Sequence, residues 1–222
     1  IARYCARPRL SASFATPMSS PPSPTARPRQ VLLFSGHRVD APGREPPRFP
    51  PSLVAPAAAA IAAALDALGA NHDDLALSQA ASGGDLLFAE ACVDRGVALQ
   101  LWLPESEPKF IAASVLGSAG ADDWRARYFA LKARLVDAPQ VLVPGAPDDP
   151  PSDPFERCNL QLLASALSHG ATKLRFICLW DGAAGDGPGG TAPMVREVER
   201  HGVPVTWIDT RTLAAKYGKN AP

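Results

Sequence analysis

The sequence predicts an α/β fold, a Rossmann-like three-layer sandwich with a mainly parallel sheet. Short apolar runs typical of buried strands alternate along the chain with longer segments of helical character. Parallel neighbours need crossover connections, and helices of this length supply them. Three of the strands are also followed by glycine-containing turns, as in folds that bind ligands beyond the carboxyl ends of a sheet.

The predicted strands are short apolar runs that end close to turn-forming residues. The first stops at Ser35-Gly36, and the third is closed by Pro104. They cover residues 31–34, 75–78, 97–103, 141–143, 174–180 and 203–208.

The predicted helices fill the intervals between the strands, apart from a proline-rich loop over 38–51 and a glycine-rich loop over 181–190. Ser52 is the expected N-cap of the first helix, since a serine hydroxyl can accept from the free amides of a first turn. The helices cover residues 52–68, 86–91, 109–115, 122–135, 155–169 and 192–201.

The chain of 222 residues has the length of one domain, or of one domain with a tail. Residues 1–29 are rich in Pro, Ser and Arg, contain no acidic residue and are expected to form a disordered leader. Their composition resembles that of a transit peptide, while Met18 offers an alternative translation start. The Rossmann-like ligand-binding domain is predicted over 30–212, and 213–222 is predicted as a short, frayed helical tail.

Composition narrows the classes of partner. Lys plus Arg and Asp plus Glu are equal at 22 each, so no chain-wide basic field exists and nucleic acid is not expected as a partner. No apolar run is long enough to cross a bilayer, so no membrane partner is expected. The four cysteines form no CxxC pair, and no histidine lies at zinc-ligand spacing from them, so no metal is predicted. This cysteine usage favours a reducing, cytoplasmic location.

The first glycine turn directly follows the first strand. Gly36 would let the backbone approach a ligand, the side chains after it can donate hydrogen bonds, and Asp40 can accept one from a ribose hydroxyl. A solvated loop with local salt bridges is the alternative interpretation. The candidate ligand-binding residues here are Ser35, Gly36, His37, Arg38, Asp40 and Arg44.

Two further glycine turns each open a helix. Backbone N–H groups at a helix N-terminus attract phosphate, and glycine leaves room for it to approach. The alternatives are a tight turn with Asp85 as an ordinary N-cap, and a flexible surface loop before Thr191. Asp181, at the end of the fifth strand, completes the set of candidates. The candidates in these turns are Ser82, Gly83, Gly84, Asp85, Gly189, Gly190 and Thr191.

Two common nucleotide-binding motifs are missing from the sequence. No GxxxxGK[ST] P-loop occurs, and no GxGxxG follows the first strand. An ordinary dinucleotide dehydrogenase is therefore not expected.

Taken together, these motifs resemble one branch of the SLOG superfamily, Rossmann-like domains related to DprA and to the Lonely Guy-type phosphoribohydrolases. The resemblance spans about residues 30 to 210. It is carried by Phe34-Ser35-Gly36-His37, Asp40, Gly43-Arg44, Pro47-Arg48-Phe49-Pro50, the segment from Ser82 to Ala91, Leu103-Pro104 and Phe110.

The resemblance implies a ligand with a phosphate and a ribose. Its phosphate site would map onto Gly83, Gly84 and Asp85 and onto the segment 189–191. That segment resembles the PGGxGTxxE signature of the phosphoribohydrolases in degenerate form, with Met194 where the pattern has its catalytic glutamate. Methionine can neither stabilise a cationic transition state nor act as a general acid.

The sequence therefore favours a non-catalytic domain that binds or senses a nucleotide or nucleotide-derived small molecule, with no cofactor and no assigned catalytic residue. One alternative is a phosphoribohydrolase or another nucleotide N-glycosidase, in which Asp40, Asp85 or Asp181 replaces the missing glutamate. The other alternative is a protein-interaction module. A homo-oligomer or a signalling partner protein stays open.

Overall fold

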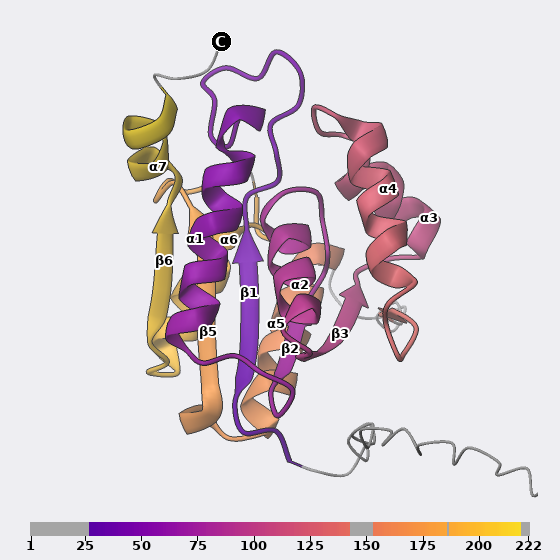
Figure 1. Cartoon of the computed structure of the whole chain (residues 1–222), viewed down its shortest axis with the longest axis vertical. Coiled ribbons are helices and arrows are strands. Elements are labelled where there is room, and N and C mark those ends of the chain that lie inside the picture. The colour runs from indigo at the N-terminus through magenta and orange to yellow at the C-terminus, as the bar shows by residue number, and fades with distance from the viewer. Residues whose placement is uncertain (1–26, 143–152, 186, 219–222) are drawn as a thin grey trace, which may run out of the picture.

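The computed structural model describes residues 27–142, 153–185 and 187–218, and in this part of the chain six strands form one parallel sheet (Figure 1). The strand order is β4-β3-β2-β1-β5-β6, and every neighbouring pair is parallel. The predicted α/β class and Rossmann-like three-layer sandwich are thus confirmed. The strands are β1 Val31–Gly36, β2 Leu75–Ser78, β3 Ala98–Leu103, β4 Gln140–Val141, β5 Leu174–Trp180 and β6 Val205–Asp209.

A helix connects each strand to the next, close to the predicted positions. The predicted bounds of β2 and β5 coincide with those of the structure, and the segment 111–115 forms a π-helical turn. Most of the predicted leader and the last residues of the predicted tail lie outside the described residues. The helical segments are η1 Pro51–Leu53, α1 Val54–Ala67, α2 Gly84–Asp94, α3 Glu107–Phe110, η2 Ile111–Val115, α4 Ala121–Lys132, α5 Pro154–Ser168, η3 Ala171–Lys173, α6 Thr191–Arg200 and α7 Thr210–Tyr217.

The expected N-cap Ser52 is wrong, and so is the alternative interpretation of Asp85 as an N-cap. Ser52 lies inside η1, and Leu53 takes the N-cap position of α1 without any side-chain cap. Proline is favoured at the first position of a helical turn, so the turn begins at Pro51 and gives Ser52 a helical backbone. The N-cap of α2 is Gly83 rather than Asp85, which lies in the first turn of that helix.

Helices cover both faces of the sheet (Figure 1). Leu32 and Phe34 of β1 pack into a core with α1, α2 and α4, whereas Val31 and Leu33 pack into a second core with α5 and α6. This alternation is the period of a strand whose two faces are both buried.

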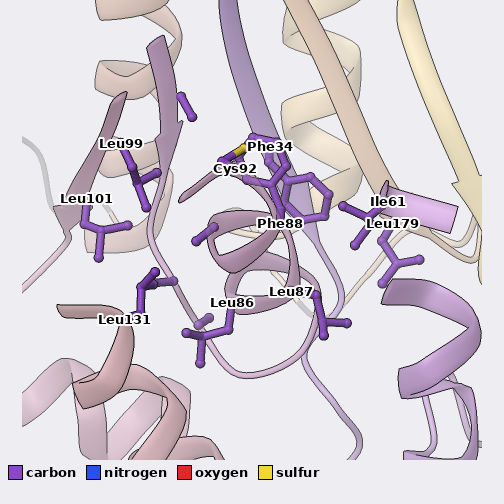
Figure 2. Close-up of a cluster of buried hydrophobic side chains, with 14 of the residues drawn as sticks. Phe34, Ile61, Leu86, Leu87, Phe88, Cys92, Leu99, Leu101, Leu131 and Leu179 are labelled. Atoms are coloured by element: carbon purple, nitrogen blue, oxygen red, sulfur yellow. The ribbon is translucent and has the colours of Figure 1, made fainter. Parts of the chain in front are cut away.

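Figure 2 shows how the first core joins β1 to α2. The rings of Phe34 and Phe88 stack with their centroids 4.8 Å apart, and Ile61 and Leu179 belong to the same cluster. An aromatic pair of this kind adds about 0.5–1.5 kcal/mol beyond the burial of its area. The stack holds the start of α2 next to the carboxyl end of β1.

The strand order reverses between β1 and β5. After β1 the chain builds outward through β2, β3 and β4, and α5 then returns it to β5 on the other side of β1. Connections that leave neighbouring strands in opposite directions open a crevice beyond their carboxyl ends, where α/β proteins bind ligands. Within the described residues no helix is long and apolar enough to span a membrane.

Candidate functional site

A pocket of about 420 Å³ lies at this switch point. It is formed by the loop after β1, the residues after β2, the start of α2, η2, and the starts of α5 and α6. Of the residues predicted from the sequence, ten line it: Ser35, Gly36, His37, Arg38, Asp40, Arg44, Asp85, Gly189, Gly190 and Thr191.

Three of the predicted residues lie beneath the pocket instead of on its wall. A Cβ on Gly83 would lie 2.7 Å from the backbone N of Val39, and the N–H of Gly84 donates to the carbonyl of His37 at 3.0 Å. Ser82 is fully buried and donates to the carbonyl of Ser114 at 3.0 Å. In this structure the Gly-Gly pair lets α2 pack against the loop after β1.

Asp85 is the buried acid of the pocket. Its side chain lines the pocket, is 9% exposed and leaves Oδ1 without a hydrogen-bond partner. Burial raises the pKa of Asp85 to about 7, against the opposing effects of the backbone N–H groups of Ala81 and Gly36 and the charge of Arg38. A large part of the Asp85 population is therefore a neutral carboxylic acid at physiological pH.

Asp181 lies behind the pocket wall and holds the side chains of Arg48 and His37 in the loop after β1. Arg48 donates to its carboxylate through Nε at 2.9 Å, and the N–H of Ala183 donates at 2.9 Å. These bonds outweigh the effect of burial and hold the pKa of Asp181 well below its usual range. Asp181 therefore stays ionised and anchors Arg48.

His37 is held as a neutral ring by the same cluster. Burial and the charge of Arg48 lower the pKa of His37. The backbone N–H of Asp181 donates to His37 Nε2 at 3.1 Å, and Arg48 Nη2 lies 3.3 Å from the same atom. Since Nε2 accepts, the proton is on Nδ1.

Asp40 shapes the proline-rich loop. Its Oδ2 accepts from the backbone N–H groups of Arg48 and Phe49, each at 2.9 Å, and Arg44 Nε lies 3.6 Å from Oδ1. One carboxylate thus closes the loop and holds Arg44 at the pocket. Asp40 is committed to these contacts, so a bond to a ribose hydroxyl would come in addition to them.

Two side-chain amides that were not predicted from the sequence form a hydrogen-bonded chain between the end of β2, α5 and the start of α6. Gln79 Nε2 donates to Asn159 Oδ1 at 2.7 Å, and Asn159 Nδ2 donates to the carbonyl of Gly189 at 2.9 Å. Gln79 and Asn159 are both buried and both line the pocket. The position of Gln79 directly after a strand could have indicated it, whereas Asn159 lies inside a helix and carries no such signal.

Besides α2, two further helices begin at the pocket. Asp153 caps α5 by accepting from the N–H groups of Phe155 and Glu156, at 2.9 and 3.0 Å. The N-cap of α6 is Gly190, which provides no side-chain cap. The N-terminus of α6 therefore offers partial positive charge to an anion.

No family model and no curated protein matches the chain.

The charges and hydrogen-bonding groups of the pocket wall therefore indicate which ligand the pocket could bind. Positive charge comes from Arg38, Arg44 and Arg48, and the amides and Asp85 supply neutral donors and acceptors. Among the described residues, no group of three or more His, Cys, Asp or Glu could hold a metal ion. Met194 is 2% exposed and packs in the second core, so it offers no reacting group to a ligand.

Proposed function

We propose that this chain is a non-catalytic domain that binds or senses a nucleotide or nucleotide-derived ligand. The observation that carries the proposal is the pocket at the switch point between β1 and β5, into which the starts of α5 and α6 open. Its volume of about 420 Å³ is in the range of small-molecule sites, roughly 300–1,000 Å³.

The chemistry of the wall supports an anionic ligand that also has polar, uncharged parts. Arginine guanidinium groups and a helix N-terminus without a side-chain cap favour phosphate. The Gln79–Asn159 amide chain and Ser35 offer hydrogen bonds to a sugar or a base. A nucleotide combines both kinds of group.

Membership of the SLOG superfamily is part of this proposal. It is supported by the placement of the motif residues, since the segments 35–38 and 189–191, far apart in the sequence, line one pocket. A cytoplasmic location is proposed with it, because the free, buried thiols of Cys92, Cys158 and Cys178 suit a reducing compartment.

One observation favours an enzyme as the second candidate. A carboxyl group with a pKa of about 7 is suited to general acid catalysis at neutral pH, and Asp85 lies in the ligand pocket. A nucleotide N-glycosidase would use such a group to protonate the leaving base. Met194 in the core argues against the phosphoribohydrolase arrangement.

The test is a thermal-shift screen with AMP, NAD, ADP-ribose and cyclic AMP, followed by chromatography of each incubation. A ligand at about a hundred times its Kd should stabilise the protein by about 2.7 kcal/mol. A shift without product supports the binding domain, and release of free base supports the enzyme. If no nucleotide shifts the transition or is converted, the nucleotide proposal is wrong.

A matched pair of arginine variants separates binding at the pocket from general charge effects. Arg38→Gln removes a pocket guanidinium that donates to the carbonyl of Ala113 at 2.5 Å, so the Kd for AMP should rise about tenfold. Arg200→Gln makes the same charge change on the surface of α6, outside this pocket, and should leave the Kd unchanged. Equal effects of the two variants would place the anion elsewhere.

A further inference from the structure

The carboxyl group of Asp85 lines the pocket but is buried without a full set of hydrogen bonds. The residue is 9% exposed and lies in the first turn of α2, and its Oδ1 is fully buried and makes no hydrogen bond within the protein. Burying a charged oxygen without a partner costs more than burying a neutral one. The geometry therefore favours a neutral carboxylic acid at the pocket wall.

The charged and titratable groups around Asp85 come from two sides. The loop after β1 contributes His37 and the ions of Asp40, Arg38, Arg44 and Arg48. The start of α5 contributes Asp153 at the pocket wall.

Two of the neighbours keep their neutral form as Asp85 titrates. Cys158 of α5 lies close enough for the charge of Asp85 to add to the effect of burial, and together they raise the pKa of the thiol to about 12. The pKa of His37 is lowered. A proton exchanged by the pocket between about pH 7 and pH 8 is therefore assigned to Asp85.

We propose that Asp85 binds the ligand as a carboxylic acid, with the O–H of its pocket-lining carboxyl group donating a hydrogen bond to an acceptor oxygen of an anionic nucleotide. The inference rests on the proposed function and adds the protonation state in which the pocket binds. Ionised Asp85 would present a lone pair, and a second negative charge, to the same oxygen.

Proton linkage follows from this geometry. The bound anion favours the acid form, so binding above about pH 7 must take up a proton. The Kd of an anionic nucleotide then rises with pH, approaching tenfold per pH unit once the free carboxyl group is ionised. A ligand group that donates to the carboxylate would produce the opposite slope.

The experiment is isothermal titration calorimetry with NAD and ADP-ribose, whose phosphate groups do not titrate in this range, between about pH 6 and pH 8.5, in pairs of buffers with different heats of ionisation. The wild-type Kd should rise at least about tenfold over this range, with uptake approaching one proton at the upper end. Asp85→Asn, whose amide donates at every pH, should bind with a Kd that does not change with pH. His37→Gln should retain the wild-type slope.

The outcomes separate the inference from the function on which it rests. If the wild-type Kd is independent of pH, or if Asp85→Asn keeps the wild-type slope, the inference is overturned while nucleotide binding stands. If no probe binds at any pH, the proposed function fails and the inference fails with it. The inference is supported if Asp85→Asn still binds the nucleotide with a Kd that no longer depends on pH. Asp85→Leu, which cannot donate a hydrogen bond, should not bind the nucleotide.

Discussion

At the scale of single residues, two aspartates at the pocket, Asp85 on its wall and Asp181 behind it, have surroundings that shift their pKa values in opposite directions. Asp181 receives charge-assisted bonds from Arg48 and stays ionised, whereas Asp85 has an unpartnered Oδ1 and a pKa of about 7. Burial raises the pKa of Asp85, whereas the bonds from Arg48 and Ala183 outweigh burial at Asp181 and lower its pKa. Asp181 is therefore a fixed anchor, and Asp85 is the group that can change charge.

The raised pKa of Asp85 predicts a specific dependence of stability on pH. The folded protein holds this proton up to about pH 7, whereas the unfolded chain loses it near the ordinary aspartate pKa of 3.8. The stabilisation of the folded state by this proton is complete below about pH 4 and disappears as pH rises to about 7. The free energy of unfolding should therefore fall by up to about 4 kcal/mol over this range.

Urea unfolding of the wild type and of Asp85→Asn at several pH values measures this contribution. The difference in the free energy of unfolding between the two proteins should grow in favour of the variant between about pH 4 and pH 7. Asp181, with its lowered pKa, acts in the acid range below about pH 4 and is common to both proteins. Parallel pH profiles would show that Asp85 is ionised in the folded state at neutral pH.

At the scale of elements, the packing of α2 against the loop after β1 depends on Gly83. Its φ is +92°, and an added Cβ would lie 2.7 Å from Val39 N and 2.8 Å from His37 O. Backbone atoms cannot move aside as the end of a flexible side chain can. The floor of the pocket therefore depends on this glycine even though the ligand would not touch it.

Gly83→Ala should lower the free energy of unfolding by about 3 kcal/mol, from backbone strain and overpacking together. Gly43→Ala is the matched control, because Gly43 also has a positive φ, +76°, but an added Cβ there would meet nothing within 4 Å. Gly43→Ala should lower the free energy of unfolding by only about 1 kcal/mol. Equal losses in the two variants would mean that the contact with the loop after β1 contributes nothing.

The fold was predictable because apolar runs and glycine turns are local signals. The bounds of β2 and β5 follow from buried apolar segments, and the alternation of elements predicts the parallel sheet. Ser52 failed as an N-cap because Pro51 competes for the start of the turn.

The site was only partly predictable. Glycine turns pointed to the edge of the sheet where the pocket lies, but which side chains face the pocket depends on tertiary packing. Gly83 and Gly84 look like a phosphate cradle in the sequence and form a packing contact in the structure. Asn159 shows the reverse, since its role depends on Gln79 and Gly189, residues that are distant in the chain.

At the scale of the whole molecule, two apolar cores enclose the sheet and bury three cysteine thiols away from solvent. Cys92 lies in the first core, and Cys158 and Cys178 lie in the second, all of them at 0% exposure. Burial raises the pKa of each thiol, to about 12 for Cys158 and Cys178. Thiolate, the reactive form, is therefore scarce in the folded protein.

A thiol-reactive chromophore at about pH 8 should label none of these three cysteines quickly in the folded protein and all three at once in denaturant. The measurement uses a Cys5→Ser variant, since Cys5 lies outside the described residues. Fast labelling of one thiol without denaturant would show that one core opens while the other stays closed.

The reversal of strand order also governs when the pocket comes into existence. Ser35 and Thr191 meet across a separation of 156 residues, and Asn159 joins the carbonyl of Gly189 to Gln79. During synthesis the loop after β1, which forms one side of the pocket, is translated early. The opposite side forms only after residues 189–191 and α6 have been translated. If the proposed function holds, a nucleotide can bind only after most of the domain has been translated, and it would then connect the first and last segments of the domain.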